Sequence, residues 1–206
     1  VTIEGTADLL STVNVKASSA QTALDIRGGT QADINISGAS NVTTAAGITS
    51  KHINGSAMTG NLTTTLGTAG ANLKGTGGSG DDTLNGASGD DVLYGGSGDD
   101  KLKDSSGDND LYGGSGDDTY VIEDSNNTIH EGGWGEGTDV VEAHITYSLD
   151  GIDNVENLTL KGTENIDGIG NSLDNVLTGN GGNNSLSGRS GEDIIYGGAG
   201  EDVLNG

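Results

Sequence analysis

The chain has 206 residues with a formal net charge of -23, and it contains 39 glycines but no phenylalanine, proline or cysteine. Only 31% of the residues are hydrophobic, which excludes a broad conventional core, and the lack of cysteine excludes disulfides and thiolate metal sites. The acidic charge disfavours nucleic acid and anionic membrane surfaces as partners, because both are negatively charged. No apolar run is long enough to predict direct membrane insertion.

Residues 1–75 form a charge-neutral segment in which four acidic and four basic residues cancel, so the whole net charge lies in residues 76–206. Short alternating apolar pairs, such as Val13 with Val15 and Ile34 with Ile36, are separated by Gly, Ser, Thr and Asn. Alternation of this kind predicts short strands joined by turns. The pairs recur at nearly regular intervals, which predicts solenoid coils in this segment.

Residues 76–121 contain five consecutive nine-residue units, the first of which reads GGSGDDTLN. The first six residues of a unit are typical of a turn, because glycine accepts positive φ without steric cost. The last three predict a short strand whose middle side chain faces inward. A fixed short repeat predicts a solenoid, because one unit cannot bury its own apolar side chain and must stack on copies of itself. The inward positions are Leu84, Leu93, Leu102, Leu111 and Tyr120.

The turns of this block are strongly acidic, with eleven Asp against two Lys between Gly77 and Val121. Carboxylates brought together on narrow turns repel one another unless cations lie among them. Calcium is the cation that prefers carboxylate and backbone carbonyl oxygens. The alternative is that Asp and Gly are simply good turn formers, which explains one unit well but five units in register poorly.

The nonapeptide G-G-x-G-x-D-x-U-x resembles the repeat of the RTX family, whose ligand is calcium. This resemblance implies an all-β fold, a parallel β-roll or β-solenoid in one elongated stack, in which a unit stacks on the next but one and several Ca²⁺ ions lie between stacked turns. We expect the weakest site of the block between Asp91 and the neutral Asn109, where Asp108 is a candidate to compensate. The resemblance places Asp82, Asp100 and Asp118 on one edge and Asp91 with Asn109 on the other.

The strict period lapses in residues 122–169, although strand signals persist. One unit is recognisable from Trp134 to Val141, and it makes Asp139 a further, weaker calcium candidate. We interpret this segment as longer, irregular coils that continue the same stack.

A second, weaker block occupies residues 170–206, with metal positions at Asn175, Asn184, Asp193 and Asp202. Stacking between alternate units pairs Asn175 with Asp193 and Asn184 with Asp202. Each pair has one neutral member, which predicts weaker calcium binding because affinity follows the number of charged ligands.

Other chemistry finds little support in the sequence. The three histidines are scattered, and the run from His130 to Trp134 departs from the HExxH zinc motif in its glycines and its last residue. No nucleophile elbow or phosphate-binding loop is present. We therefore expect no catalytic activity.

The RTX resemblance further implies a secreted, extracellular or cell-surface protein exported unfolded by a type I secretion system. Low hydrophobicity with high charge predicts disorder without calcium and folding with it. Residues 1–75 lack the acidic turns, so their coils should be calcium-poor.

The Thr, Ala, Asn and Gly bias around residues 54–62 resembles β-solenoid regions of RTX-type surface-layer (S-layer) proteins and adhesins. We therefore favour a non-catalytic module of such a structural protein, with self-association or neighbouring S-layer or adhesin domains as candidate partners. The alternative is an accessory module of a secreted enzyme such as a protease, lipase or polysaccharide epimerase. Because the sequence begins within a pattern and ends at Asn205 and Gly206, we expect a fragment of a longer protein.

Overall fold

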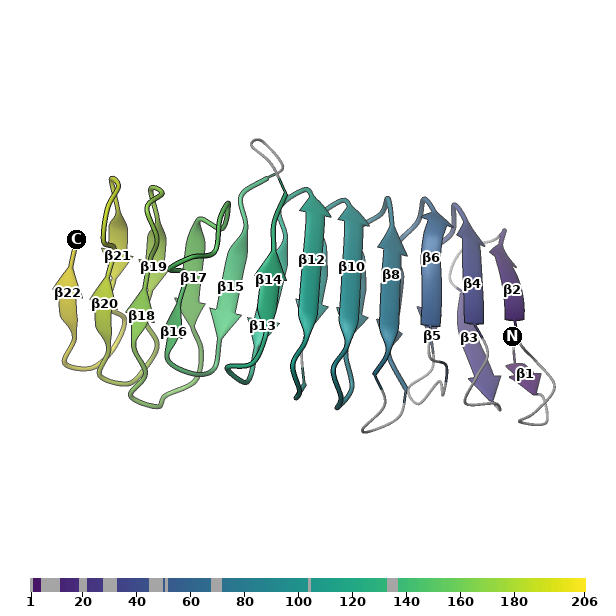
Figure 1. Cartoon of the computed structure of the whole chain (residues 1–206), viewed down its shortest axis with the longest axis horizontal. Helices are drawn as coiled ribbons and strands as arrows, with labels where there is room; N and C mark the ends of the chain where they lie inside the picture. The colour runs from purple at the N-terminus through teal and green to yellow at the C-terminus, as the bar shows by residue number, and fades with distance from the viewer. Residues whose placement is uncertain are drawn as a thin grey trace.

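The computed structural model describes residues 2–4, 12–18, 22–27, 33–44, 50, 52–67, 72–103, 105–132 and 137–206. These residues are all-β, and their strands stack side by side into one elongated solenoid, with the two ends of the chain at opposite ends of the stack (Figure 1). The predicted fold class is therefore confirmed. The described part of the chain has no helix capable of spanning a membrane.

The odd-numbered strands form one parallel sheet along the length of the stack, in chain order. Each strand pairs with the strand two places later, so one coil contributes one strand to this sheet. Among the described residues, the eleven strands of this sheet are β1 (Thr2–Glu4), β3 (Thr22–Arg27), β5 (Val42–Thr44), β7 (Leu62–Thr65), β9 (Thr83–Asn85), β11 (Lys101–Lys103), β13 (Thr119–Ile122), β15 (Val140–Ala143), β17 (Asn157–Leu160), β19 (Val176–Thr178) and β21 (Ile194–Tyr196).

The even-numbered strands lie on the other side of the coils and divide, among the described residues, into two parallel sheets. The seven-stranded sheet contains β2 (Thr12–Ala17), β4 (Asp33–Gly38), β6 (His52–Met58), β8 (Lys74–Gly78), β10 (Val92–Ser97), β12 (Asp110–Ser115) and β14 (Thr128–His130). The four-stranded sheet contains β16 (Tyr147–Ser148), β18 (Gly168–Ile169), β20 (Ser185–Ser187) and β22 (Val203–Asn205). The division falls in the irregular segment between the two repeat blocks.

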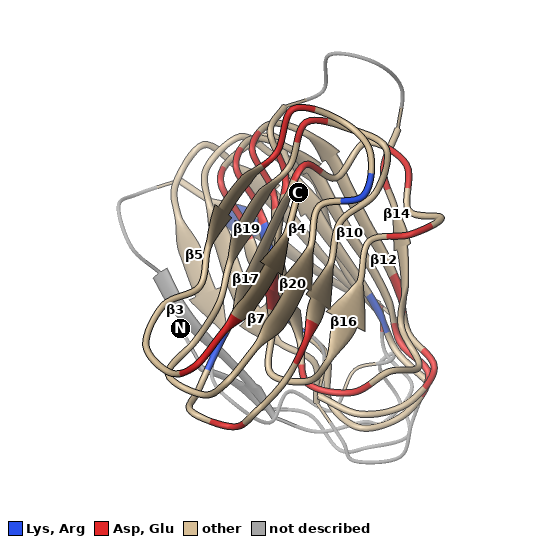
Figure 2. Ribbon diagram, turned by 90° about the vertical axis from the view of Figure 1, so that its left-hand side faces the viewer, with Lys and Arg blue, Asp and Glu red and all other residues tan. Residues whose placement is uncertain are grey.

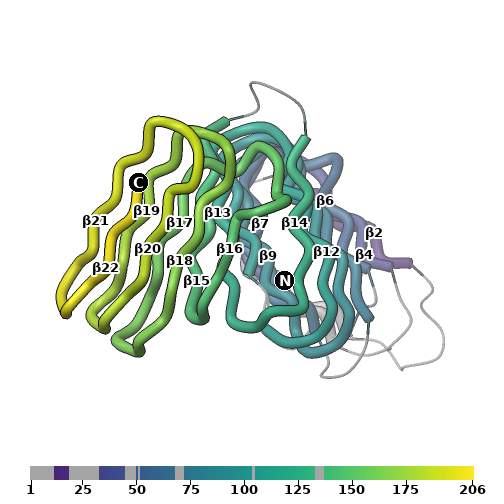
Figure 3. Tube along the Cα trace, turned by 60° about the vertical axis from the view of Figure 1, so that its left-hand side comes forward, coloured from purple at the N-terminus to yellow at the C-terminus, as the bar shows by residue number. Residues whose placement is uncertain are grey.

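The strand register confirms that a nonapeptide stacks on the next but one. Leu93 of β10 pairs with Leu111 of β12, and Leu84 of β9 pairs with Leu102 of β11. Equivalent residues of neighbouring coils in the first block are therefore 18 positions apart, the length of two units. Figure 3 shows the coils following one another along the stack.

The core is a narrow column of apolar side chains that lies between the odd-numbered and the even-numbered strands of the solenoid. Leu84, Leu93, Leu102, Leu111 and Tyr120, the predicted inward residues of the first block, are all 0% exposed. Full burial of a leucine-sized side chain stabilises a fold by about 1.5–3 kcal/mol. The inward residue of each unit thus contributes apolar contact between successive coils, although the chain is poor in hydrophobic residues.

Several turns of the repeat carry glycine at the second and fourth positions with a positive φ. Gly96 has a φ of 122° and Gly98 a φ of 110°. A Cβ atom on Gly98 would lie 2.6 Å from the carbonyl oxygen of Gly80 in the preceding coil. Glycine at these positions allows the turns to stack closely.

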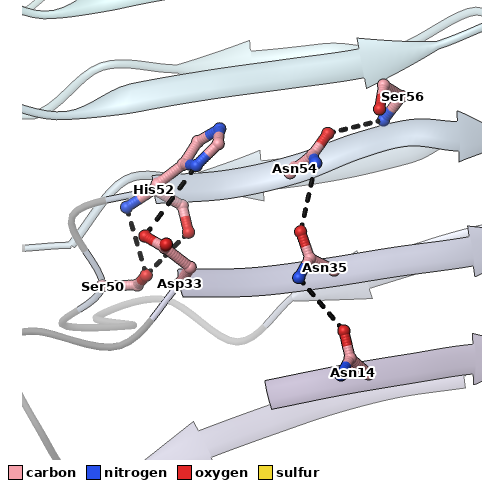
Figure 4. A network of polar contacts seen from close by, with 7 residues as sticks. All are labelled: Asn14, Asp33, Asn35, Ser50, His52, Asn54 and Ser56. Atoms are coloured by element: carbon pink, nitrogen blue, oxygen red, sulfur yellow. Dashed lines mark hydrogen bonds and ion pairs between the residues drawn. The ribbon is translucent and has the colours of Figure 1, made fainter. Parts of the chain in front are cut away.

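The coils of the charge-neutral segment are held by uncharged side chains. Asn35 donates a hydrogen bond from Nδ2 to Asn14 Oδ1 at 3.0 Å, and Asn54 donates to Asn35 Oδ1 at 3.1 Å (Figure 4). Inside the coils, the buried hydroxyls of Thr44 and Thr64 lie 2.8 Å apart. An amide or hydroxyl both donates and accepts, so these ladders need no ion to balance them.

The irregular segment continues the stack, as the strand signals predicted. Tyr120 of β13 pairs with Val141 of β15, which in turn pairs with Leu158 of β17. These coils are uneven, since Asp118 and Asp139 are 21 positions apart and Asp139 and Glu156 are 17 apart. Trp134, at the start of the unit predicted around Asp139, lies outside the described residues.

Candidate metal centre

The sixth residue of alternate units forms a buried column, which we call the first Asp column: Asp82, Asp100, Asp118 and Asp139. The backbone N–H of each residue donates to Oδ1 of the next, at 2.6 Å from Asp82 to Asp100 and at 2.8 Å in the two later steps. The structure thus brings together the three aspartates predicted on this edge and adds Asp139 to them. Glu156 continues the column by accepting from the Asp139 N–H at 2.8 Å.

In three residues of this column the second carboxylate oxygen lacks a partner. Oδ2 of Asp82, Asp100 and Asp118 is buried and accepts no hydrogen bond. A buried polar atom without a partner costs free energy, and a buried charge costs more. A cation beside each of these three oxygens would offset that cost.

The space beside each of these oxygens is a cradle that only glycine leaves open. A Cβ atom on Gly77 would overlap Asp82 Oδ2 and the carbonyl oxygen of Gly95 in the next coil. A Cβ atom on Gly95 would meet Asp100 Oδ2 and the carbonyl oxygen of Gly113. Carboxylate and carbonyl oxygens from two coils thus converge on one point, which is the donor set that calcium prefers.

Burial raises the pKa of these carboxyl groups, and neighbouring carboxylates raise it further. The pKa rises to about 6 for Asp82 and Asp118 and to about 8 for Asp100 and Asp139. In each case desolvation is the largest cause, partly offset by backbone N–H donors. The column therefore takes up protons near neutral pH when no cation neutralises it.

The opposite edge of the first block has less need of a cation. The Asp91 N–H donates to Asn109 Oδ1 at 2.7 Å, so the predicted pair is brought together. Both carboxylate oxygens of Asp91 are already partnered, by the N–H of Leu73 at 2.9 Å and that of Ala87 at 3.0 Å. Asn109 Nδ2 donates to Asn127 Oδ1 at 2.8 Å, which extends this edge by a residue that the repeat pattern does not contain.

Asp108 lies outside the buried edge, in an exposed ladder formed by the fifth residues of the units. Its N–H donates to Asp90 Oδ1 at 3.1 Å, and the Asp117 N–H donates to Asp99 Oδ1 at 3.0 Å in the same way. Asp108 thus makes the exposed ladder contact that all five units of the first block share, and its compensating role beside Asn109 stays a prediction. The sequence contained a signal for this exposed ladder, because the fifth residue of all five units is aspartate.

The second block replaces two carboxylates by amides. The Asn175 N–H donates to Asp193 Oδ1, and the Asn184 N–H to Asp202 Oδ1, both at 2.9 Å, so both predicted pairs are brought together. The Asn175 amide Nδ2 also donates to the Glu156 carbonyl at 2.9 Å, and that of Asn184 to the Ile166 carbonyl. The side-chain amide thus satisfies a carbonyl oxygen of the preceding coil directly, so no ion is needed between the two coils.

Acidic residues gather on the loops at the two ends of the coil cross-section, as Figure 2 shows looking along the stack. The profile of the RTX calcium-binding nonapeptide repeat (4 copies) matches residues 76–103, 94–129 and 169–204. Both blocks match the RTX calcium-binding nonapeptide repeat, which supports the RTX calcium-binding family. The RTX matches cover the two predicted blocks and leave most of the irregular segment between them unmatched. Comparison of the chain with curated proteins and with solved structures found no match.

Without calcium, acid should stabilise the RTX coils. The folded-state pKa values of about 6 and about 8 exceed the ordinary value of 3.8, so the folded state binds more protons than the unfolded state. This stabilisation is fully present below about pH 4 and is lost as the pH rises through about 6 to 8. We expect the β-sheet circular-dichroism signal of the chain in chelator to be stronger at about pH 5 than at about pH 8. A signal that grows as the pH rises over this range would contradict the assignment.

Asp100→Asn tests the first Asp column, with Asp99→Asn as the matched control. Asp100 is buried, whereas Asp99 is exposed, so the two variants remove the same charge from different places. Asp100→Asn should weaken calcium binding and lose about 1.4 kcal/mol of calcium-dependent stability at tenfold excess of ligand over its dissociation constant. The same variant should gain stability in chelator, because an amide here removes a buried charge. Calorimetric titration and urea unfolding would measure both effects, and equal behaviour of the two variants would refute the column.

Proposed function

We propose that this chain is a non-catalytic, calcium-dependent structural module of a secreted bacterial protein, and that it folds when it meets extracellular calcium. The observation that carries the proposal is the row of buried, unpartnered Oδ2 atoms on Asp82, Asp100 and Asp118. Each lies beside a carbonyl oxygen of an adjacent coil or another side-chain oxygen, in a space kept open by glycine. An arrangement of this kind is unfavourable empty and favourable around a hard cation.

Because calcium would bind these oxygens only in the folded state, calcium binding and folding are thermodynamically linked. The calcium concentration then controls whether the chain is folded or unfolded, which we call the calcium switch. A ligand that binds only the folded state stabilises it by RT ln(1 + [L]/Kd), which is about 1.4 kcal/mol per site at tenfold excess. Three sites of this kind would supply about 4 kcal/mol, against a typical domain stability of about 5–15 kcal/mol. Extracellular calcium modules have dissociation constants of about 10⁻⁴ to 10⁻³ M, so the switch operates at the calcium concentrations found outside cells.

The placement of charge supports export in the unfolded state. Where calcium is scarce, the acidic turns of residues 76–206 repel one another and the coils stay open. The chain then remains suited to type I secretion, which the RTX resemblance implies and which carries unfolded passengers. Outside the cell, calcium neutralises the turns and the coils close in register.

The charge-neutral coils support a structural role in a surface layer or an adhesin. The sheet that contains the RTX strands β9, β11 and β13 continues through β7 and β5, whose coils are held by neutral side chains. An extended stack of this kind provides a long, rigid body. A calcium module attached to an enzyme would instead require a catalytic domain elsewhere in the protein.

Circular dichroism of the whole chain with calcium and with chelator tests the switch. We expect chelation to remove most of the β-sheet signal and added calcium to restore it, because the unpartnered carboxylates of the acidic coils lose the cations that neutralise them. An unchanged spectrum in chelator would refute calcium-dependent folding.

Electron microscopy of the same samples separates the structural role from the alternative. Calcium-dependent assembly into ordered sheets or filaments would support the surface-layer role. A chain that folds with calcium but stays monomeric at high concentration would refute self-assembly of this module, while leaving the calcium switch intact.

A further inference from the structure

Glu131 occupies a position at which the neighbouring coils carry glycine. His130 pairs with Tyr112, so the following residue, Glu131, stands where Gly113 stands one coil earlier. In the regular coils, the carbonyl of this first residue faces the aspartate of the coil before. Above Gly113, however, the groups that surround the open space are Asp118 Oδ2, the Tyr120 hydroxyl and Glu131 Oε1. A second carboxylate, that of Glu131, therefore enters this cradle.

Tyr120 is the group that fixes this carboxylate. It stands at the inward position that is leucine in the other four units of the block, and it is 0% exposed. Its hydroxyl donates a hydrogen bond to Glu131 Oε1. The exceptional Tyr and the exceptional Glu thus occur together and contact each other.

Three carboxylates meet at this point. One oxygen each from Asp118, Glu131 and Asp139 can be chosen so that all lie within 4.8 Å of one another. Asp118 Oδ2 and Glu131 Oε2 are both buried, and neither has a hydrogen-bond partner. Among the described residues, no lysine or arginine forms an ion pair with any of the three. Buried like charges this close are strongly unfavourable unless a cation lies between them.

The donor set favours calcium over other metal ions. All the available atoms are oxygens, which argues against zinc and copper, since those ions prefer nitrogen or sulfur ligands. Magnesium demands a near-ideal octahedron and keeps several waters, whereas calcium tolerates irregular sets of six to eight oxygens. The ligand set is irregular here, because the Glu131 carboxylate takes the place of the glycine carbonyl oxygen of the regular coils.

We propose that Asp118, Glu131 and Asp139 hold one calcium ion in a three-carboxylate site, to which Glu131 contributes a ligand from outside the nonapeptide repeat. The proposal rests on calcium-dependent folding of the RTX coils. This site binds calcium more tightly than the regular turns, because affinity rises with the number of charged ligands. It lies where the last regular coil meets the irregular segment, and it closes the first block.

Calorimetric titration of the whole chain with calcium tests the site through Glu131→Gln, with Glu164→Gln as the matched control. Gln has the size of Glu and still accepts the Tyr120 hydrogen bond, whereas Glu164 is exposed and lies outside the cluster. We expect Glu131→Gln to weaken the tightest binding event on the order of tenfold or more and to leave the others unchanged. Glu164→Gln should titrate like the unmodified chain.

Glu131→Gly provides a second variant, because glycine is the residue that the regular coils carry at this position. It keeps the test available if Glu131→Gln does not fold in calcium, and it should also lose the tightest binding event. Titrations of both variants that match the control, or a uniform weakening of every binding event, would overturn the proposed site while the calcium switch stands. An unmodified chain that binds no calcium would overturn the proposed function as well.

Discussion

Stacking in register places like groups on like groups, and in this chain the groups at the turns are carboxylates. The 18-residue coil brings the backbone of Asp82 to the carboxylate of Asp100, and that of Asp100 to the carboxylate of Asp118. One oxygen of each group is satisfied by a backbone N–H, and the other faces its neighbours with no partner. The same parallel register that aligns the leucines therefore aligns the charges. The stability of the coils depends on how those charges are neutralised.

The chain contains two solutions to this constraint. In the first Asp column, glycine cradles and converging oxygens make room for a hard cation. At Asn175 and Asn184, a side-chain amide donates a hydrogen bond to a carbonyl oxygen of the preceding coil. The amide thus satisfies an oxygen that a cation would otherwise bind. The Asn14, Asn35 and Asn54 ladder of the neutral coils follows the same logic on their outer face. The exchange of Asp for Asn thus sets how far each part of the stack depends on calcium.

Much of this arrangement was predictable from the repeat. A period of nine with alternating side chains predicted the inward leucines. The resemblance to the RTX family implied the alternate-unit stacking, and with it the pairs of metal positions. The exposed ladder of Asp90 and Asp108 was missed, since the family pattern treats the fifth position as variable. Asp100 and Asp91 occupy the same position of the repeat, yet Asp100 Oδ2 has no hydrogen-bond partner whereas both oxygens of Asp91 accept one. No sequence pattern predicts this difference.

In the irregular segment, residues 122–169, the repeat period no longer predicts which residues stack on one another. Glu156 reaches the first Asp column at a spacing of 17 residues, so its register could not be assigned without the structure. Asn127 and Glu131 keep the 18-residue spacing to Asn109 and Gly113, but no nonapeptide motif marks them in the sequence. Tyr120 was a signal in the sequence, because it is the one aromatic residue among five inward positions. Its meaning appears only when its hydroxyl is seen to contact Glu131.

Hydrogen exchange resolved by segment, with and without calcium, tests the central claim most directly. If calcium alone neutralises the first Asp column, amides in residues 76–121 should be protected in calcium and should exchange freely in chelator. Amides of the neutral coils in residues 52–67 should change much less, because their ladders need no ion. Equal protection of residues 76–121 in the two conditions would contradict the account.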